Sequence, residues 1–428
     1  MRLSIYWLGF ILIGFSDTDA LAQKTAIVCK QLIDGTGKVI QNAAIVIEAD
    51  RIVAVGSRAI IPKEAIITDL GEFTVLPGLI DAHVHPFIDK DDYQVDHLRR
   101  SSAQKALEGL KNMQDLLQAG WTALRIAGDA DVAYAQFDIR NAINKGLFVG
   151  PHIFGAGHYI SVTGGGGDIN FLSHEQPVLA DGLVANGPDE MRKAVREEVK
   201  HGSDWIKILV TGAFMTVGDN PQDVHFSSEE LKAVMDEANR RHRPVMAHAH
   251  ATEGIKMAVR AGVRSIEHGS YLDEEGIDLM LEHNTYLVPT LAVGLFFQEK
   301  YFNSKALAKA VQLGKQDSDE NQKNKMLALA IRKGVKVALG TDNVGFPATF
   351  PAREFAELVK LGMTPMQAIQ AGTKVNADLL GKEKDLGTLE VGKLADLIAV
   401  KGNPLTDITE LQRVKFVMMG GKMVKHEK

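Results

Sequence analysis

Eight short runs of apolar and β-branched residues alternate with amphipathic helical patterns through the middle of the chain. The runs predicted as strands cover residues 79–85, 122–128, 152–157, 205–211, 244–249, 265–269, 285–291 and 336–342. Helices are expected between them, for example over residues 101–119, 188–201, 228–241 and 252–261. Strands that alternate with helices form parallel sheets. Eight such units over about 300 residues predict an α/β fold of the (β/α)8 TIM-barrel type rather than an open sheet.

The two ends of the chain show a different pattern, in which short strands alternate with turns rich in Gly, Asn and Asp. Neither end by itself contains a convincing core. We therefore predict a small β-sandwich domain assembled from both termini, residues 23–78 and 385–428. The barrel domain is expected to occupy residues 79–384.

The first 22 residues have the pattern of a signal peptide. Arg2 precedes an apolar run of 11 residues, 5–15, which is too short to span a bilayer. Ala20 and Ala22 then provide the small-residue spacing that a signal peptidase accepts. We expect cleavage after Ala22, export to the periplasm or the medium, and no stable membrane association of the mature chain. The alternative is an uncleaved anchor or a buried N-terminal helix.

Charge and cysteine content exclude several functions. The formal net charge is −6 and no Lys/Arg-rich run occurs, which argues against nucleic acid as a partner. The single Cys29 excludes an internal disulfide and a cysteine-based metal cluster. The 14 histidines are more informative, because several of them lie in short patterned groups.

Polar residues occur where the predicted strands end, which is where a (β/α)8 barrel has its active site. His83 and His85 end the first strand and point the same way, because residues two apart on a strand share a face. The fourth strand carries Lys207, and the fifth, sixth and eighth strands end in His248, His268 and Asp342. Each residue alone has an ordinary explanation, such as a core histidine, a helix cap or a salt bridge. Their joint occurrence predicts a site for zinc or a similar divalent ion, because the ligands are imidazole and carboxylate.

Five stretches of the sequence resemble the signature motifs of the amidohydrolase superfamily: LPGLIDAHVHP at residues 76–86, WIKILVTG, MAHAHATEGI, SIEHG and LGTDN. The resemblance covers essentially the whole mature chain. Within the superfamily, the chain is most similar to the exported branch of imidazolonepropionase-like hydrolases and Xaa-Pro dipeptidases (prolidases). That branch also contains carboxypeptidase-like and ochratoxin-degrading amidohydrolases.

The resemblance implies a binuclear centre with two divalent ions, zinc being the first choice. It assigns His83, His85 and Asp342 to the first metal and His248 and His268 to the second. Lys207, carboxylated on its amine, would bridge both ions. The chemistry agrees, because a lysine beside two dications loses its proton, and a neutral amine reacts with CO2 to give an anionic carbamate.

The same resemblance implies hydrolysis of an amide bond by a metal-bound hydroxide, with Asp342 as general acid and base. The expected substrates are small: dipeptides or N-acyl amino acids that release a C-terminal amino acid, ochratoxin-type amides included. A cyclic-amide or imidazolone-type hydrolase, or a deaminase, is the second hypothesis, although Lys207 argues against a mononuclear deaminase. A non-enzymatic metal-binding protein is the third, against which the complete ligand set argues.

Residues for substrate binding are less sharply defined. His158, Tyr159, Arg125 and Tyr271 are candidates for the substrate carboxylate or carbonyl, with a purely structural role as the alternative for each. His250 is expected beside the ligands rather than among them. The glycine-rich loop over residues 157–168 lacks the G-K-[ST] of a phosphate-binding loop. In it, Gly166 stands where many relatives have a histidine, which predicts room for a larger substrate.

The helical insert over residues 300–333 and the aromatic stretch before it predict a lid or an oligomer contact. The resemblance implies a homo-oligomer, and octamers fall within the range it allows.

Overall fold

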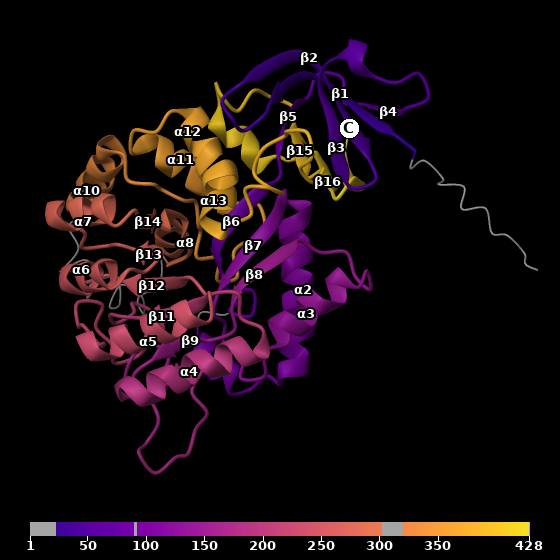
Figure 1. The fold of residues 1–428 in the computed structure, drawn as a ribbon. Coiled ribbons are helices and arrows are strands. Elements are labelled where there is room, and N and C mark those ends of the chain that lie inside the picture. Colours follow the sequence, from indigo (N-terminus) through magenta and orange to yellow (C-terminus); the bar gives the residue numbers. More distant parts are fainter. Residues whose placement is uncertain (1–22, 90–91, 302–319, 428) are drawn as a thin grey trace, which may run out of the picture.

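The computed structural model of the protein describes residues 23–89, 92–301 and 320–427 (Figure 1). The predicted signal peptide lies outside the described residues, as do residues 302–319 of the insert predicted over residues 300–333. None of the helices in the described part of the chain is long and apolar enough to cross a membrane.

Strands from both ends of the chain form one sheet of eight strands, coloured indigo and yellow in Figure 1. They are β1 (Thr25–Ile33), β2 (Val39–Glu48), β3 (Arg51–Ser57), β4 (Ile66–Asp69), β5 (Thr74–Pro77), β15 (Leu397–Val400), β16 (Phe416–Met419) and β17 (Lys422–His426). The two ends meet where β15 pairs antiparallel with β5. Ile27, Ile45, Leu397 and Phe416 share one buried cluster, so the two ends complete a core together. A two-layered sandwich and its boundaries stay predictions.

The middle of the chain forms two parallel sheets. One contains β6 (Leu79–Val84), β7 (Trp121–Ala127) and β8 (His152–Ala156). The other runs in the order β10 (Leu183–Val184), β9 (Tyr159–Ser161), β11 (Ile206–Leu209), β12 (Val245–Ala249), β13 (Ser265–His268) and β14 (Tyr286–Val288). Seven of the eight predicted runs are therefore strands, and they pair in parallel as expected from the strand–helix alternation.

The eighth predicted run, residues 336–342, is not a regular strand. It is joined to its neighbours by single parallel bridges, Leu287 to Val337 and Val84 to Asn343. At the end of the run, the Thr341 N–H donates to the Asp81 carboxylate and Asp342 has a φ of 53°. Backbone hydrogen bonds still connect this run to both neighbouring strands. The Ala338 N–H donates to the Leu287 carbonyl of β14, and the Ala82 N–H of β6 donates to the Leu339 carbonyl.

Backbone hydrogen bonds also connect the two parallel sheets between β8 and β11. The backbone N–H groups of Asp204 and Trp205 both donate to the carbonyl of Gly155, at 2.9 and 3.1 Å. Backbone hydrogen bonds therefore link the two parallel sheets at both of their junctions.

Most of the helices surround the parallel strands (Figure 1). The helices are α1 (Tyr93–His97), α2 (Ser102–Gln118), α3 (Ala135–Asn144), α4 (Gly187–His201), α5 (Ser228–Arg240), α6 (Thr252–Ala261), α7 (Glu274–Glu282), α8 (Leu291–Tyr301), α10 (Glu320–Lys333), α11 (Arg353–Lys360), α12 (Pro365–Gln370) and α13 (Asn376–Leu380). The four helices predicted by range correspond to α2, α4, α5 and α6, with ends within one residue. Capping boxes begin α5, with Ser227 and Glu230, and α12, with Thr364 and Gln367.

Candidate metal centre and active site

His83 and His85 bring two imidazole nitrogens together at the end of β6. Their Nε2 atoms lie 3.2 Å apart, and Asp342 Oδ1 lies 3.6 Å from His83 Nε2 and 3.3 Å from His85 Nε2. The opposite nitrogens are occupied, since His83 Nδ1 contacts Glu267 Oε2 at 2.7 Å and His85 Nδ1 contacts the Gly128 carbonyl at 2.6 Å. The Nδ1 atoms therefore carry the protons, and both Nε2 lone pairs face the Asp342 carboxylate.

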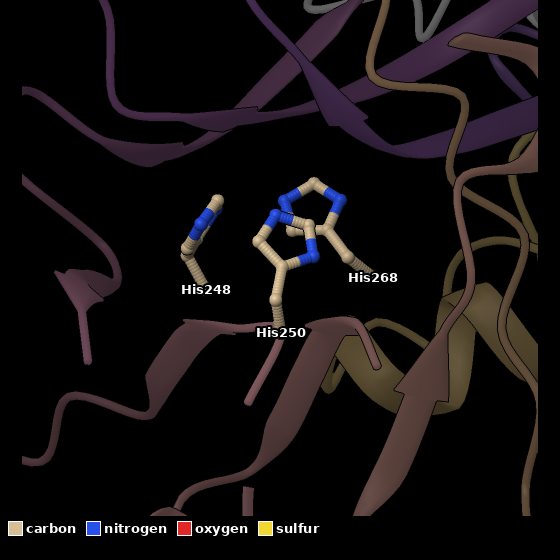
Figure 2. A group of neighbouring side chains, drawn as sticks. All are labelled: His248, His250 and His268. Carbon is tan, nitrogen blue, oxygen red and sulfur yellow. The ribbon is translucent and has the colours of Figure 1, made fainter. Parts of the chain in front are cut away.

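A second group of histidines lies at the ends of β12 and β13. Figure 2 shows the side chains of His248, His250 and His268 gathered together. One nitrogen from each of the three lies within 4.8 Å of the others, and His268 also belongs to a similar group with His83 and Asp342. His268 thus joins the two groups into one centre.

His250 is placed more centrally than expected. The sequence predicted it beside the ligands, but its ring stacks on that of His268 with centroids 4.8 Å apart. Its Nδ1 atom lies 2.8 Å from Ser270 Oγ, which leaves Nε2 as the remaining nitrogen. The structure offers three imidazoles where the prediction used two.

Burial keeps His83, His248, His250 and His268 neutral. It lowers the pKa of His83 to about 4 and that of His248 to about 3, and the nearby charge of Lys207 acts in the same direction. Burial also lowers the pKa of His250 and of His268 well below the ordinary value. Neutral imidazoles are the form that binds metals.

Lys207 is fully buried on β11, and its charge affects the pKa values of His83, His248, His268 and Asp342. Burial lowers the pKa of the Lys207 amine to about 8, with Arg125 acting in the same direction and Glu267 and Asp342 opposing it. An amine with such a pKa is partly neutral near physiological pH, which is the form that reacts with CO2.

Asp342 remains ionised in this setting. Burial alone would raise its pKa, but the adjacent His85, His83 and Lys207 hold the pKa below its ordinary value. An ionised carboxylate among neutral imidazoles, without cysteine, is a donor set that fits zinc or a similar divalent ion. The residues present therefore fit the metal site that the sequence predicted, and the number and identity of the ions belong to the proposal below.

Glu267 and Arg125 form a buried ion pair beneath the histidines. Arg125 Nη2 lies 2.8 and 2.9 Å from the two carboxylate oxygens of Glu267, and neither side chain is exposed. Arg125 also donates to Ser265 Oγ and to the Ala82 carbonyl. Its guanidinium is thus occupied by the protein, so the predicted contact with a substrate gains no support. The pair instead orients His83 through Glu267.

Sequence reasoning missed Glu267, although a signal was present. Ser265 and Glu267 are polar residues two apart on a strand, a spacing that puts both on one face. A charged side chain on a buried strand needs a partner, which indicates an ion pair inside the sheet.

The other predicted substrate residues lie around the centre with protein partners. His158 Nδ1 lies 2.8 Å from Glu198 Oε1, and the Tyr159 hydroxyl donates to the Asp181 carboxylate. The Tyr159 ring is 6.4 Å from that of His85, centroid to centroid. The Tyr271 N–H donates to the His250 carbonyl at 3.0 Å. Their contacts with substrate stay predictions.

Gly166 lies close to the end of β11 and the loop that follows it. A Cβ at this position would lie 3.0 Å from Leu209 Cδ1 and 3.1 Å from Ala213 Cβ, so a larger residue would require these side chains to shift. The room for a larger substrate stays a prediction.

The fold and the site together define a class of protein: a parallel α/β enzyme with a histidine-rich centre at the strand ends. A model of the amidohydrolase family matches residues 74–424. The ochratoxinase of Aspergillus niger is 36% identical over 94% of this chain and 87% of its own sequence. Its crystal structure has a TM-score of 0.83 and 34% identity, covering 95% of this chain and 96% of the other.

Two further proteins are similar to this chain along most of its length. The crystal structure of a Xaa-Pro dipeptidase with bound methionine in the active site has a TM-score of 0.86 and 38% identity, covering 94% of this chain and 100% of the other. The imidazolonepropionase of Paracoccus denitrificans is 27% identical over 84% of this chain and 87% of its own sequence. The chain belongs to the amidohydrolase family, which confirms the predicted resemblance. It is a hydrolase that acts on amide or peptide C–N bonds.

Proposed function

We propose that the protein is a binuclear metal-dependent amidohydrolase that releases a C-terminal amino acid from dipeptides or N-acyl amino acids. The observation that carries the proposal is that His268 belongs to both ligand groups. Two sets of donors that share a member, with a buried amine of lowered pKa beside them, suit a pair of bridged ions.

The ligands divide into two sets. His83, His85 and Asp342 hold one ion, and His248 and His268 hold the other, with His250 as a further donor. Carboxylated Lys207 bridges the two, which are zinc ions in this proposal. Divalent ions bound here supply Lewis acidity at the scissile carbonyl and lower the pKa of a bound water.

Asp342 moves the proton. Its carboxylate is ionised, so it accepts the proton of the attacking water and then passes it to the leaving amine. Glu267 and the Gly128 carbonyl hold His83 and His85 in the tautomer that keeps both Nε2 lone pairs toward Asp342.

The mouth of the site favours an apolar group on the substrate. Phe214, which follows β11, is 47% exposed, and its ring meets that of His250 edge-on with centroids 4.6 Å apart. An exposed ring against a candidate ligand is a surface on which an aromatic or aliphatic side chain gains hydrophobic contact. The relatives agree in class, since one is an ochratoxinase and another a dipeptidase with bound methionine.

The hydrogen bonds across both junctions of the parallel sheets support a closed (β/α)8 barrel as the frame of this site. We also propose export after cleavage at Ala22 and assembly into a homo-oligomer. The sequence pattern supports export. Mass spectrometry of the N-terminus and the mass of the native particle test these two points.

A screen of dipeptides and N-acyl amino acids for amine release tests the proposed activity. We expect turnover of amides with a free C-terminal carboxylate, ochratoxin-type amides among them. A second candidate activity, hydrolysis of cyclic amides of the imidazolone type, is motivated by the imidazolonepropionase relative. Turnover of cyclic ureides without turnover of linear amides would select it.

A further inference from the structure

Thr290 has an unusual backbone conformation for its residue type. It lies between β14 and α8, is 2% exposed, and has a φ of 47°. A β-branched residue in the left-handed region is strained, and such strain persists only where the surroundings hold it. The strained residue touches the metal centre, because Thr290 Oγ1 lies 2.7 Å from His268 Nδ1.

The groups that hold Thr290 lie on its C-terminal side. Glu354, on α11, is completely buried, and its two carboxylate oxygens accept hydrogen bonds from the N–H groups of Leu291 at 2.9 Å and Ala292 at 2.6 Å. Burial raises the pKa of Glu354 to about 8, and this rise is opposed by the hydrogen bonds from these two N–H groups, which begin α8. They belong to the two residues that follow Thr290.

Residues near Glu354 in the chain also contact α8 farther along the helix. Arg353, next to Glu354, pairs with Glu299 at 2.7 Å. The rings of Phe296 on α8 and Phe346 pack with centroids 4.4 Å apart. The chain that follows Asp342 therefore fixes the helix that follows Thr290.

We propose that Glu354 is a positioning residue for the metal centre, acting through Thr290 on His268. By holding the first two N–H groups of α8, it keeps Thr290 in the left-handed conformation that presents its hydroxyl to His268 Nδ1. The hydroxyl then accepts a hydrogen bond from the Nδ1–H of His268, which leaves Nε2 of His268 as the metal-binding nitrogen. The inference rests on the metal centre of the proposed function.

A simple cap for α8 would also explain a buried glutamate, so the test uses a readout that capping alone would not change. The measurement is the rate at which the purified protein loses its metal to a chelator. Glu354→Gln keeps the size of the side chain, but it leaves one acceptor oxygen and places an NH2 group against a backbone N–H. Glu357→Gln is the matched control, because Glu357 lies on the same helix and pairs with Lys360 at 2.6 Å on its surface.

Glu354→Gln is expected to accelerate metal loss by about tenfold or more, the usual effect of removing a group that orients a ligand. Thr290→Val, which removes the hydroxyl, is expected to do the same, whereas Thr290→Ser and Glu357→Gln stay within about twofold of the parent. The double variant Glu354→Gln/Thr290→Val should lose metal no faster than Thr290→Val alone, because the two residues act in series.

Two results would contradict the role of Glu354 and leave the proposed function intact. One is an equal rate of metal loss in the Glu354→Gln and Glu357→Gln variants. The other is a double variant in which the effects of Glu354→Gln and Thr290→Val on that rate multiply. A lower melting temperature of Glu354→Gln with unchanged metal loss assigns the residue to capping and also contradicts it. A parent protein that binds no divalent ion contradicts the proposed function, and this inference with it.

Discussion

The Nδ1 atom of His83 lies 2.7 Å from Oε2 of Glu267, and both side chains are fully buried. Burial would raise the pKa of Glu267, but Arg125 and His83 lower that pKa to about 2, so the carboxylate is ionised. An ionised carboxylate at Nδ1 fixes the proton there and directs Nε2 of His83 toward Asp342. This is the carboxylate–histidine–metal arrangement in which the outer group sets the tautomer and the basicity of the ligand.

Replacing Glu267 by Gln should therefore damage both the fold and the metal site. The change leaves the Arg125 guanidinium buried without a counter-charge, which costs about 3–5 kcal/mol of unfolding free energy. Metal affinity should fall by about 10–100-fold. Denaturant unfolding and metal titration measure the two effects. Glu72→Gln, at the exposed pair with Lys30, serves as control and should change neither quantity.

Lys207→Ala should lose activity together with at least one metal ion. In the parent protein, activity recovered by adding zinc and bicarbonate to metal-stripped protein should depend on pH at constant dissolved CO2. The pKa of the buried amine is about 8, so its reactive neutral fraction rises roughly 25-fold from pH 6.5 to 8.5. Recovery should accelerate accordingly. A pH-independent recovery, or full activity in Lys207→Ala, would contradict the bridging carbamate.

Phe214→Ala should alter substrate preference without affecting stability, because the ring is almost half exposed. KM for substrates with an aromatic C-terminal residue should rise by about tenfold, and KM for the alanine analogues should change little. Phe148→Ala is the control: Phe148 is similarly exposed, at 49%, but lies in the turn before β8, at the opposite end of the strand from the centre. Equal effects of Phe214→Ala on both substrate classes would remove Phe214 from the substrate site.

The Asp342→Asn variant should retain the fold but lose most of its catalytic activity. The amide can neither accept the proton of water nor return it to the amine, so kcat should fall by about 10²–10⁴-fold. Steady-state kinetics at saturating metal measure the loss, and circular dichroism checks the fold. A variant that keeps more than a tenth of the parent kcat would place the proton transfer on another group.

Site residues whose role follows from their position within a single strand could be predicted from the sequence. His83 and His85 are two apart on an apolar strand, and His248 and His268 lie at or next to the carboxyl ends of β12 and β13, whereas Lys207 is the second residue of β11. Their prediction needs only the period of a strand and the position of the active site in a parallel α/β barrel. The helices with strong amphipathic patterns and caps were placed equally well.

Residues whose role depends on a partner far away in the sequence could not be predicted in this way. Arg125 meets Glu267 from a strand 142 residues earlier, and that contact depends on how the sheets are arranged in space. Thr341 bonds to Asp81 over 260 residues, at the end of the eighth run. Glu354 and Thr290 are linked through the start of α8. For each, the sequence shows a polar residue in an apolar setting but not its partner.

Anomalous diffraction from crystals of the purified protein at the zinc edge would locate the metal ions themselves. We expect two peaks per chain, one among His83, His85 and Asp342 and one at His248 and His268, with electron density for a carboxylated Lys207 between them. A single peak, or peaks remote from these five side chains, would contradict the binuclear centre on which the proposed activity rests.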